Sequence, residues 1–250
     1  MTAHGIRSHT WLRVLREVAI ACAAFIAYFG ARGITEGDAQ RARCNADTII
    51  EIERALGILW ELAMQRAISD HGVLITLANW VYIWGHWPVI ASVGAWLLYQ
   101  RPMTYAIIRN AFLMSGSIGL LIFMLFPVAP PRLVDLGVID TVTLHSHAYR
   151  VLQPPAFVNQ YAAMPSLHFG WDLLIGIALV KESGRVLVRL FGGIMPGLML
   201  LAVILTANHY VLDVVAGGVV ALVGLAFAGY IHHLRADAPP SRPAHRPLRT

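Results

Sequence analysis

Two histidines and an aspartate stand where long apolar runs begin in the second half of this 250-residue chain. His168 ends the string Pro165-Ser166-Leu167-His168, and His209 opens the string His-Tyr-Val-Leu-Asp, which ends at Asp213. Residues four apart share one face of a helix, so a carboxylate at 213 can hold the His209 imidazole in one tautomer and raise its basicity. An ionisable side chain in an apolar segment is costly without a polar partner. The two strings therefore predict nucleophilic and acid–base chemistry; the alternative is interfacial hydrogen bonding without chemistry.

The composition indicates that these strings lie in a membrane protein. The chain is 57% hydrophobic and 13% charged, whereas soluble proteins carry about 25% charged residues. A spanning helix needs about 20 apolar residues. We therefore expect an all-α fold: a six-span transmembrane helical bundle forming a single membrane-embedded domain over residues 1–235, with a disordered basic tail over 236–250. The spans are expected near 14–34, 72–99, 105–127, 164–180, 186–207 and 210–234.

The distribution of charge predicts the orientation of the bundle. With six spans, twelve of the nineteen basic residues fall on the side of the termini, while seven basic residues and nine of the fourteen acids fall on the other side. The positive-inside rule then places both termini in the cytoplasm. Segments 35–71, 128–163 and 207–209 are extracytoplasmic, so Arg132 and both histidines meet at one outer face. We expect a multi-pass protein of the plasma or inner membrane, with membrane lipids and no nucleic acid as partners.

Segment 39–69 is predicted to be an amphipathic helix between the first two spans. Its isoleucines and leucines recur at helical spacing among charged residues, which is typical of a helix at the outer interface. We interpret it as a structural lid packed on the bundle. The alternative is that it grips a substrate head group through Glu51, Glu61 and Gln65.

The combination of Pro-Ser-x-His with His-x-x-x-Asp resembles the type 2 phosphatidic acid phosphatase superfamily. The fuller strings, Ala-Ala-Met-Pro-Ser-Leu-His and Asn-His-Tyr-x-x-Asp, look most like its inositol phosphorylceramide synthase branch, and the likeness covers roughly residues 50–220. The first superfamily motif, Lys-x6-Arg-Pro, is absent, and Val203 stands where an arginine is common. These departures fit the inositolphosphotransferase branch better than an ordinary phosphatase.

The resemblance implies a lipid phosphotransferase or phosphatase with a phosphohistidine intermediate. His209 would be the nucleophile, Asp213 would orient it, and His168 would serve as general acid and then as base. Ser166, with backbone amides at the start of a helix, would bind phosphate oxygens. Arg132 would replace the missing cations as a bidentate clamp. No cofactor or metal is implied; zinc binding by this small ligand set is the alternative.

Several polar neighbours have more than one interpretation. Asp172 lies one helical turn from His168 and either tunes it or pairs within the bundle. His86 is best explained by a core hydrogen bond. Asn159 and Tyr161 could touch a head group, and Asn208 directly precedes the nucleophile.

Two classes of function are compatible with these residues. An enzyme would act on a lipid phosphoester whose lipid is a ceramide, a diacylglycerol or a polyprenol, with water or a polyol such as inositol as acceptor. A non-catalytic lipid carrier or flippase would use the same pocket only for phosphate binding. The His209–Asp213 spacing favours the enzyme, because a carrier needs no nucleophile–carboxylate pair.

Overall fold

The computed structural model describes residues 3–34, 38–145 and 159–236, and within them the chain is helical. This part contains no strand, only one isolated parallel bridge between Val128 and Ala162. The predicted all-α class is confirmed; residues 237–250 of the predicted tail lie outside the described part. The helices are α1 (Ala3–Ile34), α2 (Ala39–Leu56), α3 (Glu61–Ile68), α4 (Gly72–Trp84), α5 (Trp87–Gln100), α6 (Pro102–Leu125), α7 (Thr141–His145), α9 (Leu167–Glu182), α10 (Val186–Leu205) and α11 (Val211–Ala236).

Three of these helices, α6, α10 and α11, are long and apolar enough to cross a membrane. The pair α4 and α5 meets the same criterion as one broken span, bent by 44°. Helices also occupy the first and fourth predicted spans, as α1 and α9. However, α9 has only 16 residues, which is about 24 Å of helix. Six spans therefore stay a prediction, while three or four are supported within the described residues.

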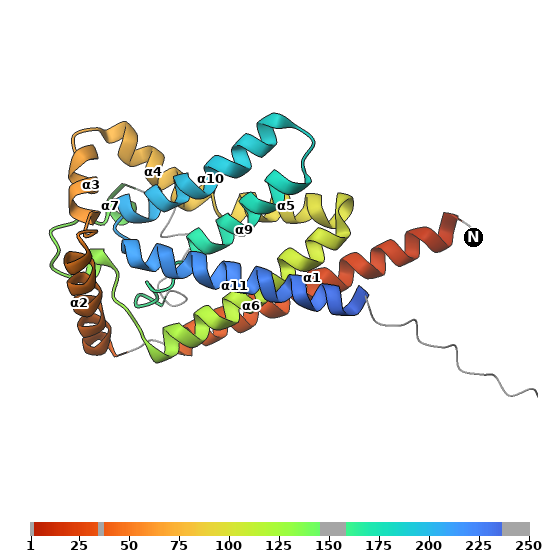
Figure 1. The fold of residues 1–250 in the computed structure, drawn as a ribbon, viewed down its shortest axis with the longest axis horizontal. Coiled ribbons are helices and arrows are strands. Elements are labelled where there is room, and N and C mark those ends of the chain that lie inside the picture. The colour runs from red at the N-terminus through yellow and green to blue at the C-terminus, as the bar shows by residue number, and fades with distance from the viewer. Residues whose placement is uncertain (1–2, 35–37, 146–158, 237–250) are drawn as a thin grey trace, which may run out of the picture.

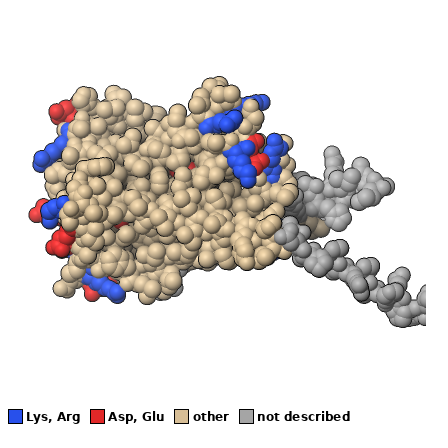
Figure 2. All heavy atoms as spheres, in the orientation of Figure 1, with Lys and Arg blue, Asp and Glu red and all other residues tan. Residues whose placement is uncertain are grey.

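The surface of the bundle is divided along its long axis. On the face shown in Figure 2, charged side chains gather near the two ends, and a broad uncharged band separates them. Large apolar side chains such as Leu121, Ile194 and Val219 are more than half exposed. Exposed apolar area of this extent is suited to lipid tails rather than to water, which supports an integral membrane protein.

The span formed by α4 and α5 is broken at Gly85 and His86. Pro88 lies in the first turn of α5, where its missing N–H group is not needed. His86, which precedes α5, has φ −92° and ψ −85°, outside helical geometry. The break therefore brings an imidazole into the interior of the bundle.

Helices α9 and α11 approach each other closely at the centre of the bundle. A Cβ atom on Gly217 would lie 2.1 Å from the carbonyl oxygen of Ser166, and one on Gly170 would lie 2.5 Å from the carbonyl oxygen of Gly217. The Ser166 N–H group donates to the carbonyl oxygen of Asp213 at 2.8 Å. The starts of the two motif-bearing helices are thus joined backbone to backbone.

The amphipathic segment 39–69 forms two helices rather than the one predicted. Gly57 ends α2 in the left-handed region at φ 70°, and its N–H group donates to the carbonyl oxygens of Glu53 and Arg54. A glycine adopts this conformation without a Cβ penalty, so it stops the helix. Helices α2 and α3 lie at the end of the bundle opposite the start of α1 (Figure 1).

Two polar side chains of α3, Glu61 and Gln65, lie against other segments of the protein. The Gln65 side chain accepts from the Ile139 N–H group and donates to the carbonyl oxygens of Ile139 and Leu205. Glu61 is fully buried, while Glu51 of α2 is exposed. These contacts favour the lid interpretation over the head-group role considered for Glu61 and Gln65, and the function of this segment stays a prediction.

Candidate active site

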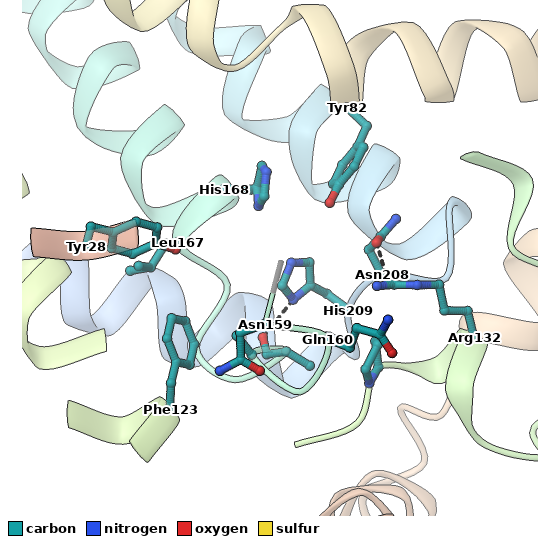
Figure 3. Close-up of a pocket in the computed structure, with 13 residues that line it drawn as sticks. Tyr28, Tyr82, Phe123, Arg132, Asn159, Gln160, Leu167, His168, Asn208 and His209 are labelled. Atoms are coloured by element: carbon teal, nitrogen blue, oxygen red, sulfur yellow. Dashed lines mark hydrogen bonds between the residues drawn. The ribbon is translucent and has the colours of Figure 1, made fainter. Parts of the chain in front are cut away.

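Three connecting segments meet at the end of the bundle beside α2 and α3, and they enclose a pocket (Figure 3). They are the segment after α6, the segment before α9 and the turn between α10 and α11. The pocket holds Arg132, His168 and His209, which the sequence placed at one depth. The lining residues are Tyr28, Tyr82, Phe123, Pro130, Arg132, Asn159, Gln160, Ala162, Ala163, Leu167, His168, Asn208 and His209.

The His209 imidazole is held through Nδ1. This atom lies 2.7 Å from the carbonyl oxygen of Ala163 and 3.5 Å from Asp213 Oδ2. A carbonyl oxygen only accepts, so Nδ1 carries the hydrogen and Nε2 keeps the lone pair. Asp213 is fully buried, and its Oδ2 also accepts from the Tyr210 N–H group at 2.8 Å. The predicted pair exists, but the carbonyl is the nearer partner of the ring.

His168 stands in the first turn of α9 and faces the same space as His209 (Figure 3). The centroids of the two imidazole rings are 6.0 Å apart. The His168 ring stacks on Tyr82 at 4.9 Å and lies 4.5 Å from the His86 ring. Its position therefore depends on both halves of the broken span as well as on α9.

Arg132 enters the pocket from a short 3-10 turn, Pro131–Leu133. Its N–H group donates to the carbonyl oxygen of Ala207 at 3.1 Å. The guanidinium group donates to the side-chain oxygen of Asn208 and lies 3.6 Å from Asp140 Oδ2. Asn208, predicted as a neighbour of the site, thus orients the cation. Arg150, the other cation of this region in the sequence, lies outside the described residues.

Four of the predicted site residues do not line the pocket: Asp213 and Asp172, which lie beside histidines, and Ser166 and Tyr161. The Ser166 hydroxyl is buried and accepts from the Phe169 N–H group at 3.5 Å, which caps α9. The Tyr161 carbonyl oxygen accepts from the Val128 N–H group at 2.8 Å, and its side chain packs with the apolar cluster under α2. Phosphate binding by the Ser166 hydroxyl stays a prediction.

Sequence reasoning missed part of the pocket lining, and it expected a core hydrogen bond of His86 without naming Asp172 as the partner. Tyr28, Tyr82, Phe123 and Gln160 line the pocket; of these only Tyr82 carries a signal, since it precedes His86 by four residues in an apolar run. Asp172 Oδ1 lies 2.9 Å from His86 Nδ1, and both side chains are buried. Asp172 therefore pairs with the residue that contacts His168.

The described residues contain no group of three or more His, Cys, Asp or Glu side chains placed to hold a metal ion. What the pocket does contain is a lone-pair nitrogen on His209, a second imidazole and a guanidinium group. A nucleophile, a proton carrier and an anion-binding group at one site suit phosphoryl transfer.

Comparisons with known proteins agree with this chemistry. The family model of the PAP2 superfamily matches residues 47–227. A phosphoinositol dihydroceramide synthase from Bacteroides thetaiotaomicron is 26% identical, with 65% of this chain and 63% of that protein covered. The chain thus spans less than two thirds of the relative's length, and no solved structure matches it significantly. Because the family match covers more than half of the chain and contains both histidine motifs, the chain belongs to the PAP2 superfamily of type 2 phosphatidic acid phosphatases.

Proposed function

We propose that the protein transfers a phosphoinositol-type group from a lipid phosphoester to an acceptor hydroxyl, through a phosphohistidine on His209. The observation that carries this proposal is the hydrogen bond from His209 Nδ1 to the carbonyl oxygen of Ala163 at 2.7 Å. It leaves the Nε2 lone pair for attack on phosphorus, with the second imidazole 6.0 Å away between ring centroids.

The proposed first step exchanges one bond to phosphorus for another. Nε2 of His209 bonds to phosphorus as the bond to the lipid oxygen breaks, and His168 gives its proton to that oxygen. Arg132 binds the phosphate oxygens with the donors that Asn208 leaves unused. Asp213 stabilises the imidazolium character that develops on His209.

The proposed second step returns the enzyme to its starting state. The acceptor hydroxyl attacks phosphorus, neutral His168 takes the hydroxyl proton, and the bond between nitrogen and phosphorus breaks. The relative's name favours a ceramide-type lipid and a phosphoinositol group as the two parts of the product. A polyol such as inositol is the alternative acceptor, and attack by water would make the enzyme a hydrolytic lipid phosphatase of the phosphatidic acid or polyprenyl phosphate type.

Analysis of lipid products tests the substrate assignment. Purified protein in phospholipid nanodiscs is incubated with an inositol phospholipid, with phosphatidic acid or with a polyprenyl phosphate, each with and without ceramide and free inositol. Mass spectrometry is expected to show a phosphoinositol ceramide from the inositol phospholipid and ceramide, and none with His209→Ala. Release of inorganic phosphate together with the free lipid alcohol from phosphatidic acid or the polyprenyl phosphate, without any phosphoinositol ceramide, would establish hydrolysis instead. Lipid movement between leaflets that persists in His209→Ala, without chemical change, would establish a carrier.

We also propose that the pocket faces the extracytoplasmic side and that both termini are cytoplasmic. The start of α1 and the end of α11 lie at the end of the bundle opposite α2 and α3 (Figure 1), and the pocket lies near the start of α11. Cys44 on α2 is exposed, so in a Cys22→Ser background an impermeant maleimide is expected to label it in intact cells. A cysteine replacing Arg185, in the turn before α10, is expected to react only after permeabilisation. The reverse pattern would invert the orientation.

A further inference from the structure

The first turn of α11 is held by three buried carboxyl groups. Glu61 Oε1 accepts from the Val211 N–H group at 3.0 Å, and Glu53 Oε1 accepts from the Leu212 N–H group at 2.7 Å. Asp213 Oδ2 accepts from the Tyr210 N–H group, and all three carboxyl groups are completely buried. The first amides of a helix have no partner within the helix and carry partial positive charge, so acidic side chains satisfy them. Two of the three acids come from α2 and α3.

The remaining oxygens of the two glutamates are an independent observation. Glu53 Oε2 and Glu61 Oε2 are buried, and no described group donates a hydrogen bond to either. Leaving two ionised carboxylates together in such a place is costly, and one proton shared between them removes both the repulsion and the unsatisfied oxygens. Burial and the adjacent Glu61 carboxyl group raise the pKa of Glu53 to about 9.

We infer that Glu53 and Glu61 share one proton and together position the start of α11, and with it His209, as a carboxylic acid–carboxylate pair. Glu53 donates its proton to Glu61, and each keeps its second oxygen on an α11 amide. Both are positioning residues, because they touch α11 and not the pocket. The inference rests on the proposed role of His209 as nucleophile, although the pair itself does not.

The start of α11 is also the link between the two motifs. His209 and Asp213, two residues before and two residues after Val211, bind the Ala163 carbonyl oxygen and the Ser166 N–H group respectively. A shift of this turn would move Nδ1 away from the carbonyl that fixes its tautomer. The groups that face Glu53 are Glu61 from α3 and Asp213 and Tyr210 from α11, all of them acids. Loss of the shared proton adds a negative charge among them, so activity is expected to fall as pH rises above about 9.

The test replaces the protonated member by its neutral isostere. The Gln in Glu53→Gln keeps an oxygen for the Leu212 amide and offers an N–H donor to Glu61, without a titratable proton. Its turnover at pH 7 is expected within about twofold of wild type. Above pH 9 the wild type is expected to lose phosphoenzyme about tenfold per pH unit, while Glu53→Gln keeps it. Glu53→Ala, which leaves an amide and Glu61 unpaired, is expected to lose about tenfold or more at every pH.

Thermal unfolding gives a readout that does not depend on catalysis. Glu53 has an ordinary pKa of 4.5 when unfolded and about 9 when folded, so between these values the native state binds the extra proton. The stability that this proton gives is complete below pH 4.5 and declines as pH rises to about 9. The stability of Glu53→Gln relative to wild type is therefore expected to increase from pH 5 to pH 9. Asp70→Asn, at an exposed carboxyl after α3, is the matched control without this trend.

The outcomes separate this inference from the proposed function. Absence of any phosphoenzyme in wild type, with the pH-dependent difference in stability intact, overturns the nucleophile and leaves the pair standing. A flat stability difference, or an alkaline activity loss unchanged by Glu53→Gln, overturns the shared proton. If Glu53→Gln does not fold, Glu61→Gln is the corresponding variant of the other carboxyl group. Failure of both variants to fold also overturns the shared proton, because a pair that shares one proton should tolerate a neutral amide in place of either carboxyl group.

Discussion

The described part of the bundle contains two imidazole–carboxylate pairs, and they differ in how they are built. His209 and Asp213 lie four residues apart on one helix start, with 3.5 Å between Nδ1 and Oδ2. His86 and Asp172 come from the broken span and from α9, with 2.9 Å between Nδ1 and Oδ1. The first imidazole lines the pocket, whereas the second lies behind His168. The looser pair thus contains the ring that we propose as the nucleophile, and the tighter pair lies against the ring beside it.

The comparison teaches that a short distance between an imidazole and a carboxylate does not by itself identify the nucleophile. In the His209 pair, the carbonyl oxygen of Ala163 lies 2.7 Å from Nδ1 and fixes the tautomer. The Asp213 Oδ2 atom faces the ring and also accepts a hydrogen bond from the Tyr210 N–H group. In the His86 pair the carboxylate is the ring's own partner. We therefore expect substitutions in the His209–Asp213 pair to reduce turnover. Substitutions in the His86–Asp172 pair are expected to reduce the free energy of unfolding.

The largest expected effect is that of His209→Ala. Removing the proposed nucleophile is expected to reduce turnover by about a thousandfold or more and to abolish the trapped phosphoenzyme. His86→Ala, in the fraction that folds, is expected to form the adduct still. Labelled donor, rapid quenching and a check for an acid-labile, base-stable adduct measure both. An adduct on His168, or on a serine, would reverse the roles of the two pairs.

His86→Ala is expected to act mainly on stability. It leaves Asp172 buried without its partner, which is expected to cost about 3–5 kcal/mol of unfolding free energy. The double variant His86→Ala/Asp172→Asn removes the stranded charge and is expected to recover part of this loss. Thermal unfolding in detergent micelles compares the variants. Strictly additive effects would mean that the two side chains do not interact, contrary to the 2.9 Å contact.

Arg132→Lys is expected to give the smallest of these effects and concerns only the His209 site. An ammonium cannot bind Asn208 and a phosphate with the fork geometry of a guanidinium. Turnover is therefore expected to fall about tenfold, or about 1.4 kcal/mol in transition-state stabilisation, with the fold unchanged. Arg41→Lys, an exposed residue of α2 that donates to the Leu125 carbonyl oxygen, is the control. If Arg132→Ala keeps near wild-type turnover, the phosphate clamp lies elsewhere.

The sequence predicted the parts of the site that depend on local spacing. His168, His209 and Arg132 lie in one pocket as expected, because each stands at or near the end of an apolar run and such ends meet at one membrane face. The end of α2 also had a usable signal, since Gly57 follows a helical pattern at the position that favours a left-handed cap.

The remaining features depend on contacts between distant segments. His86 and Asp172 are 86 residues apart, and Glu53 is 159 residues from Leu212. Helical periodicity places each on a face of its own helix but does not identify the facing element. From the sequence alone, a glutamate on an amphipathic helix is interpreted as a charged residue at the membrane interface. Only the tertiary partner shows that it is buried.

The glycines that join α9 to α11 limit how this site can diverge. No side chain fits at 217 without displacing the backbone of Ser166, and none fits at 170 without displacing residue 217. The relative position of the helix starts that carry His168 and His209 therefore cannot change easily by substitution at these two glycines. A variant with a different donor lipid or acceptor is therefore expected to differ at other residues that line the pocket, such as Tyr28 and Gln160. Saturation mutagenesis is accordingly expected to find most functional changes of specificity at those lining residues. It is expected to find almost none at Gly170 and Gly217, where α9 contacts α11.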